Sequence, residues 1–164
     1  HDRIRGPVDA PLALVAYADV ACPFCRTASE AVAELRERYG DRQQYVFRHL
    51  PVEDAHPDAR RAAEALEATA AQDRFWEMHD RLFAEPGRLE LDDLAGHAQA
   101  LGMDVERFLE ALRDGVHEAA VDADVESAER SGVTGTPTFF VNGERHTGPH
   151  DAGALAEALD RVPG

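Results

Sequence analysis

The chain of 164 residues contains only two cysteines, Cys22 and Cys25. Two thiols cannot form the network of disulfides that stabilises a small secreted scaffold. A structural zinc site needs four ligands, but there is no second CxxC motif, and no two histidines have metal-ligand spacing on one helix. A purely structural disulfide between neighbouring cysteines constrains the unfolded chain little, because the loop that it closes is short. We therefore expect no metal, and we interpret the two cysteines as catalytic thiols.

Basic residues and long apolar runs are also scarce. The 17 Lys and Arg residues face 32 Asp and Glu residues, which gives a net charge of −15 and argues against nucleic acid or an anionic membrane surface as a partner. No apolar run approaches the length of a membrane-spanning helix, so we expect no insertion of this segment into a membrane. With 44% hydrophobic residues, the chain is long enough for one sizeable core, and we predict a single domain over residues 1–164.

The CxxC motif lies between a predicted strand, Leu12 to Tyr17, and a predicted helix, Pro23 to Tyr39. This order places Cys22 at the N-cap and Pro23 at the first helical position, where proline loses no hydrogen bond. Free N–H groups and the helix dipole stabilise a thiolate there. We therefore predict that Cys22 is the nucleophile and that Cys25, one turn further along, is the resolving thiol.

A second motif surrounds Pro137, in the run Gly132-Val133-Thr134-Gly135-Thr136-Pro137, and it precedes a strand-like run, Thr138 to Val141. Proline is tolerated at the start of a strand. With the CxxC motif, Arg48-His49-Leu50-Pro51 and Phe75-Trp76-Glu77-Met78-His79, the chain resembles the DsbA-type thiol-disulfide oxidoreductases of the thioredoxin superfamily. It is most similar to the bacterial branch that occurs alone or attached to sodium/proton antiporters. The resemblance covers residues from about 6 to about 162.

This resemblance implies an α/β thioredoxin-like fold with a central mixed sheet and a helical insertion at about 56–131, lying over the active-site face. It implies a cis-proline at Pro137 that faces the CxxC motif, protein or peptide thiols and disulfides as partners, an unknown redox partner and no external cofactor. The client would lie on Pro23, Phe24, Thr136 and Pro137, where the Thr136 backbone pairs with it as an added strand. With no secretory signal at the start of the chain, the bacterial cytoplasm is favoured over the periplasm, for the chain alone or as a domain of a membrane protein.

The chain departs from this family at two positions. Ala16 stands where relatives commonly carry a buried glutamate that relays protons to the resolving thiol, so we expect slower turnover unless water or another group such as Asp19 takes that role. Asp19 is equally well explained as a turn residue. Phe24 replaces a histidine that stabilises the thiolate in strongly oxidising members. An alternative function is therefore a redox-sensing or regulatory module that does not turn over repeatedly.

The remaining pattern is consistent with a β-α-β unit, a helical block and a β-β-α unit. Tyr45 to Leu50 alternates as a strand, parallel to the first, and Asn142-Gly143 marks a hairpin. The cluster from Phe75 to Phe83 is expected to be core rather than a client groove. The other predicted elements are helices near 57–71, 73–83, 92–101, 104–112, 116–130 and 154–162, and a strand near 145–147.

Overall fold

A mixed sheet forms the centre of the molecule. The computed structural model describes residues 2–162, and within them the sheet has five strands in the order β1-β3-β2-β4-β5. The parallel pair is β2 with β3, whereas β1 with β3, β2 with β4 and β4 with β5 are antiparallel. The predicted mixed sheet is therefore confirmed. The strands are β1 (Arg3–Arg5), β2 (Leu12–Ala18), β3 (Gln43–His49), β4 (Thr138–Val141) and β5 (Glu144–Arg145).

The central strand β2 is almost entirely apolar because both of its faces are covered. Leu14, Ala16 and Ala18 belong to the main core cluster. Tyr17 faces the opposite side, where it packs with residues of a second, smaller cluster. The apolar run of this strand is thus explained by one face in the main core and an opposite face that is covered near Tyr17 by Ala128 and Val133 and is half-buried at Val15.

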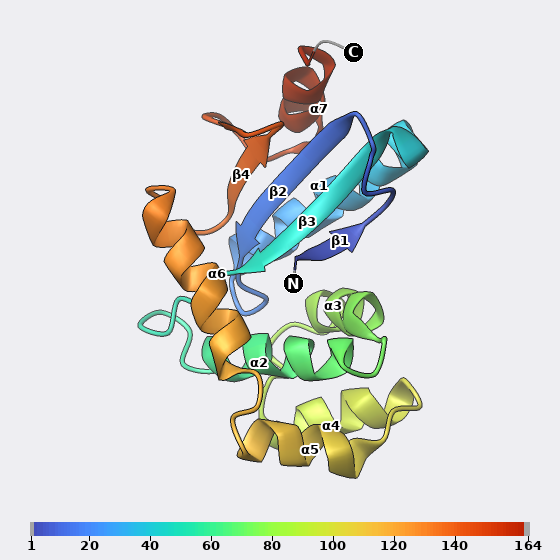
Figure 1. Cartoon of the computed structure of the whole chain (residues 1–164), viewed down its shortest axis with the longest axis vertical. Helices are drawn as coiled ribbons and strands as arrows, with labels where there is room; N and C mark the ends of the chain where they lie inside the picture. The colour runs from blue at the N-terminus through green and yellow to red at the C-terminus, as the bar shows by residue number, and fades with distance from the viewer. Residues whose placement is uncertain (1, 163–164) are drawn as a thin grey trace.

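Seven α-helices lie within residues 2–162. Each predicted element agrees with an observed one to within two residues at either end. The helices are α1 (Pro23–Tyr39), α2 (Ala59–Ala70), α3 (Phe75–Ala84), α4 (Leu91–Ala100), α5 (Val105–Arg113), α6 (Glu118–Arg130) and α7 (Ala152–Asp160), and a short 3-10 helix, η1 (Gly40–Arg42), follows α1. Of these, α1 and α7 lie beside the sheet and α2 to α5 lie beyond one of its ends (Figure 1).

The sequence pattern misses one strand. Residues before Leu12 are predicted as a turn-rich lead-in, but Arg3–Arg5 forms β1 and pairs with β3 in the register Arg3 to Phe47 and Arg5 to Tyr45. Three residues, two of them arginine, are too short and too polar to give a strand pattern. At the other edge, the β4–β5 turn contains only Asn142 and Gly143, both with positive φ, so the last strand begins at Glu144.

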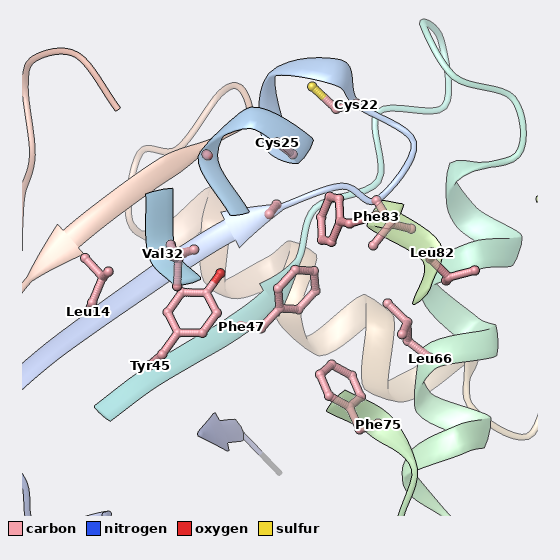
Figure 2. Close-up of a cluster of buried hydrophobic side chains, with 14 of the residues drawn as sticks. Leu14, Cys22, Cys25, Val32, Tyr45, Phe47, Leu66, Phe75, Leu82 and Phe83 are labelled. Atoms are coloured by element: carbon pink, nitrogen blue, oxygen red, sulfur yellow. The ribbon is translucent and has the colours of Figure 1, made fainter. Parts of the chain in front are cut away.

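The helical insertion, α2 to α6, lies beyond the ends of β2 and β3 where α1 begins (Figure 1). Phe75, Met78 and Leu82 of α3 belong to the same buried cluster as both cysteines, which confirms that the aromatic segment is core. Figure 2 shows Phe83 between Leu82 and the turn of α1 that carries Cys25. The insertion therefore closes the core at the end of the sheet that carries the CxxC motif. The predicted single domain stays a prediction, and its residues 1, 163 and 164 lie outside the described residues.

Candidate functional site

Cys22 occupies the N-cap of α1, and Pro23 stands in the first turn. The backbone of Cys22 is extended, with φ −85° and ψ 123°, and its carbonyl oxygen accepts the N–H groups of Cys25 and Arg26, both at 3.1 Å. The Cys22 side chain makes no capping hydrogen bond. Its sulfur is therefore not committed to the helix backbone, and it lies at the positive end of the helix dipole.

Cys25 has a different environment, although it lies on the same turn. It is 2% exposed, and its Sγ accepts the backbone N–H of Asp19 at 3.4 Å. Burial raises the pKa of the Cys25 thiol far above its ordinary value, and the N–H of Asp19 and a hydrogen bond with the Thr136 side chain oppose this shift only partly. Cys25 is thus a protonated thiol at neutral pH.

The loop before β4 reaches the same place. The side chain of Thr136 contacts the Cys25 sulfur, and the peptide bond between Thr136 and Pro137 is cis. The loop is held by the Thr138 hydroxyl, which donates to the Gly135 carbonyl at 2.7 Å, and Thr138 stands opposite Tyr17 of β2. The two sequence motifs therefore meet at one end of the sheet.

Access to the two thiols is narrow. Cys22 is 5% exposed, whereas Phe24 is 74% exposed and Pro23 is also exposed. The surface of the motif is thus an apolar dipeptide beside a nearly buried sulfur. Thr136 is half-buried and Pro137 is buried.

Asp19 makes the contacts of a turn residue. Its carboxylate is buried, and its two oxygens accept the backbone N–H groups of Ala21 at 2.8 Å and Val52 at 3.0 Å. Burial raises the pKa of Asp19, and these two hydrogen bonds oppose the rise. Asp19 therefore holds the turn before Cys22 and ties it to the loop after β3. Ala16 is fully buried on β2.

A buried ionic network near the site was not predicted. Glu67 of α2 accepts two hydrogen bonds from Arg3, at 2.9 and 2.7 Å, and lies 3.0 Å from Nε2 of His49. Burial raises the pKa of Glu67, but the hydrogen bonds with His49 and Arg3 outweigh it and lower the value to about 2. Glu67 lies four residues after the buried Ala63 on α2. This helical spacing was the one sequence signal that could have predicted a buried position for Glu67.

Within residues 2–162, no group of three or more histidine, cysteine, aspartate or glutamate side chains is placed to hold a metal ion. In the same range, no helix combines the length and the apolar character that crossing a bilayer requires.

A strand that leads into a CxxC motif at a helix N-terminus, with a cis-proline loop against the second cysteine, defines a thioredoxin-like protein. The family model described as Thioredoxin matches residues 1–161. The chain belongs to this family.

Its curated relatives include sodium/proton antiporters. The chain is 49% identical over 159 residues to the Na(+)/H(+) antiporter NhaA 3 of Salinispora tropica, which covers 97% of the chain and 24% of that protein. It is 47% identical over 164 residues to the Na(+)/H(+) antiporter NhaA 1 of Mycobacterium sp. strain KMS, with 98% and 26% covered. The chain spans about a quarter of the length of these relatives.

Solved structures share the fold over nearly the whole chain. BdbD from Bacillus subtilis superposes with a TM-score of 0.87 at 22% identity, covering 98% of this chain and 92% of BdbD. A thioredoxin-like oxidoreductase from Silicibacter pomeroyi DSS-3 gives 0.86 at 24% identity, with 98% and 91% covered. The α-DsbA1 protein of Wolbachia pipientis gives 0.84 at 20%, with 99% and 90% covered. The predicted DsbA-like fold is confirmed.

Proposed function

We propose that this chain is a thiol-disulfide oxidoreductase, which exchanges disulfides with protein or peptide thiols through a mixed disulfide at Cys22. The observation that carries the proposal is the unequal pair of thiols on one helical turn. The Cys22 side chain has no capping bond at the helix N-terminus, while Cys25 is held as a thiol against Thr136 and the Asp19 N–H. One sulfur suits attack and the other suits resolution.

In the reducing direction, the Cys22 thiolate attacks one sulfur of a client disulfide. The new S–S bond forms as the client S–S bond breaks, and the departing client thiolate takes up a proton. Cys25 then loses its proton to water and attacks Cys22 Sγ, which releases the second client thiolate and leaves a Cys22–Cys25 disulfide. Two electrons have passed to the client, and a dithiol reductant must return them. The reverse sequence oxidises a client dithiol.

The raised pKa of Cys25 has a consequence for the second step. Because burial disfavours the Cys25 thiolate and the buried residue 16 is alanine rather than an acid, we expect resolution to be the slow step. Once the mixed disulfide has formed, a short approach to the Cys22 sulfur favours Cys25 over an external thiol.

The client would lie across the two motifs. The exposed ring of Phe24, with Pro23 beside it, offers apolar contact. The backbone of Thr136, next to Pro137, pairs with an extended client segment as an added strand. The direction of exchange depends on the potential of the cysteine pair relative to its compartment, and the bacterial cytoplasm stays a prediction.

The second candidate function is a redox-sensing or regulatory module. Two observations favour it: the curated relatives are antiporters of which this chain spans about a quarter, and the fully buried residue 16 is alanine. A sensor would pass through one oxidation event and then wait for a reductant, whereas an enzyme would turn over many clients.

Reduction of insulin with dithiothreitol as the recycling reductant tests the proposal. Cys22→Ser should lower the rate to that of dithiothreitol alone, because it removes the nucleophile. Cys25→Ser, reduced first and then freed of dithiothreitol, should keep the first attack and accumulate a mixed disulfide with the client, detectable by mass spectrometry. Turnover that survives in Cys22→Ser would refute the assignment. A single turnover per enzyme in the native chain would favour the sensor.

A further inference from the structure

A groove lies between α1 and α3, on the side of α1 that faces the insertion. It has a volume of about 330 Å³, within the range of small-ligand sites. Its walls come from α1 and α3, and its floor includes Tyr45 of β3 and Arg5 of β1. The groove is separate from Thr136 and Pro137, which do not line it.

The α1 wall is a single stripe of the helix. Each member has another member three or four residues away, so the stripe follows one face of the helix. Small side chains in the middle of the stripe make the hollow, and an arginine stands at each end, about 15 Å apart at 1.5 Å of rise per residue. The stripe consists of Arg26, Ser29, Glu30, Ala33 and Arg36.

The floor holds a polar atom that has no partner. Tyr45 is 3% exposed and lines the groove together with Val32 and Phe83. Figure 2 shows its hydroxyl pointing toward α1, beside Val32. Among residues 2–162 no hydrogen bond involves this hydroxyl, although a buried phenol ordinarily finds an acceptor. Nε2 of His79, which also lines the groove, has no partner within these residues either, so the apolar lining holds two unmatched polar atoms.

Of the three arginines that line the groove, one is paired with an acid within residues 2–162 and two are not. Arg5 is already bound to Asp80 through two hydrogen bonds, at 3.1 and 2.8 Å, and it lies over the Trp76 ring. Arg26 and Arg36 form no ion pair with any residue of the described part of the chain. Three arginines against Glu30 and Asp80 leave the groove with a charge of +1 in a chain whose net charge is −15.

We infer that this groove binds an extended acidic segment of a polypeptide partner, independently of thiol exchange at Cys22. An extended chain rises about 3.3 Å per residue, so two carboxylates four positions apart fit the spacing of Arg26 and Arg36. The side chain midway between the two acids lies on the same face of the extended segment as they do, and an apolar residue there covers Val32 and Phe83. A backbone carbonyl of the segment accepts the Tyr45 hydroxyl. A segment without the two acids has no counterpart for the arginines.

The test uses a fluorescein-labelled, cysteine-free peptide, acetyl-Glu-Ser-Leu-Ser-Glu-amide, and the same peptide with glutamine in place of both acids. Binding is measured by fluorescence anisotropy to the native chain and to Cys22→Ser, so that failure of the proposed thiol exchange does not affect the readout. The acidic peptide should bind both proteins equally and at least ~5-fold more tightly than the glutamine peptide, since each exposed charge pair contributes modestly.

Three variants locate the binding. Arg36→Gln should weaken binding of the acidic peptide about 3-fold, through loss of one charge pair. Tyr45→Phe removes only the hydroxyl and should weaken binding of both peptides about 3-fold, through loss of one hydrogen bond. Arg113→Gln changes an exposed arginine on α5 by the same charge and should leave the affinity within 2-fold. Equal binding of the two peptides, no binding of the acidic one, or equal losses in Arg36→Gln and Arg113→Gln would overturn the inference.

Discussion

At the scale of single residues, one carboxylate organises the approach to the CxxC motif. Asp19 contacts three parts of the site: its two oxygens hold the N–H groups of Ala21 and Val52, and its own N–H donates to Cys25 Sγ. The cysteines are thus placed by a buried turn rather than by α1 alone. The loop after β3 is attached to the same carboxylate, which couples the start of the insertion to the motif.

Asp19→Ala should lower the free energy of unfolding by about 2 kcal/mol, because two backbone N–H groups lose their acceptor. The rate of Cys22 alkylation by iodoacetamide should also change, because the turn before the N-cap loses its anchor. Urea unfolding and mass-spectrometric alkylation at pH 7 measure the two effects. Asp54→Ala, at an exposed position of the neighbouring loop, is the control. A loss below 0.5 kcal/mol in Asp19→Ala would show that the turn does not need the carboxylate.

At the scale of elements, the edge strand β1 depends on how the chain leaves it. Gly6 follows β1 with φ +97°, and a Cβ added there would lie 2.5 Å from the carbonyl oxygen of Gln43, the first residue of β3. Both the backbone conformation and the close approach require glycine. The position of β1 beside β3 therefore depends on Gly6 as well as on the hydrogen bonds between the two strands.

Gly6→Ala should destabilise the protein by about 2 kcal/mol, since it combines an unfavourable φ with a clash against main-chain atoms. Gly96→Ala is the matched control, with the opposite expected sign. Gly96 lies within α4, where an added Cβ meets no atom within 4 Å, and alanine should stabilise the helix by up to about 1 kcal/mol. Thermal unfolding of both variants compares them. Equal and small shifts in the two would contradict the role assigned to Gly6.

At the scale of the whole molecule, an ionic network joins the sheet to the insertion. Glu67 of α2 meets Arg3 of β1 and His49 of β3, and the backbone N–H of His49 donates to Asp124 of α6 at 2.9 Å. Four elements that are distant in the chain therefore share one buried site. Removal of one charged partner leaves the charge of the others buried and unpaired, which lowers the free energy of unfolding.

Glu67→Gln should lower the free energy of unfolding at pH 7 by about 2 kcal/mol. The pKa of Glu67 is lowered to about 2 in the folded chain, below that of an unfolded glutamate. Its contribution is therefore complete above about pH 4.3 and is lost as the pH falls toward 2, so the gap between the native chain and the variant should narrow over that window.

Urea unfolding at pH 7, 4.5 and 3 measures this gap. Glu64→Gln, on the same helix, breaks only an i,i+4 pair with Arg60 and should cost about 0.5 kcal/mol. A Glu67→Gln gap that stays constant down to pH 3 would mean that the pKa of Glu67 is the same in the folded and the unfolded protein, and would contradict the lowered value.

Most of the architecture could be predicted because its signals are local. Helical spacing of apolar residues, glycine and proline punctuation and the Asn142-Gly143 turn act over a few residues, and the observed elements follow them. The strand β1 could not be predicted in this way, since three residues with two arginines become a strand only when β3 offers its edge.

The amino-acid sequence by itself determined that Cys22 begins a helix and that Cys25 follows it on the first turn, because strand, cap and helix signals act within one segment of chain. Only the tertiary structure decided what surrounds the two sulfurs. It brings Thr136 to Cys25, assigns the Asp19 carboxylate to two backbone N–H groups, buries Glu67 against His49 and leaves a groove between α1 and α3. Contacts between distant segments depend on how the helices and the sheet pack together, and the secondary-structure preferences of short segments do not determine that packing.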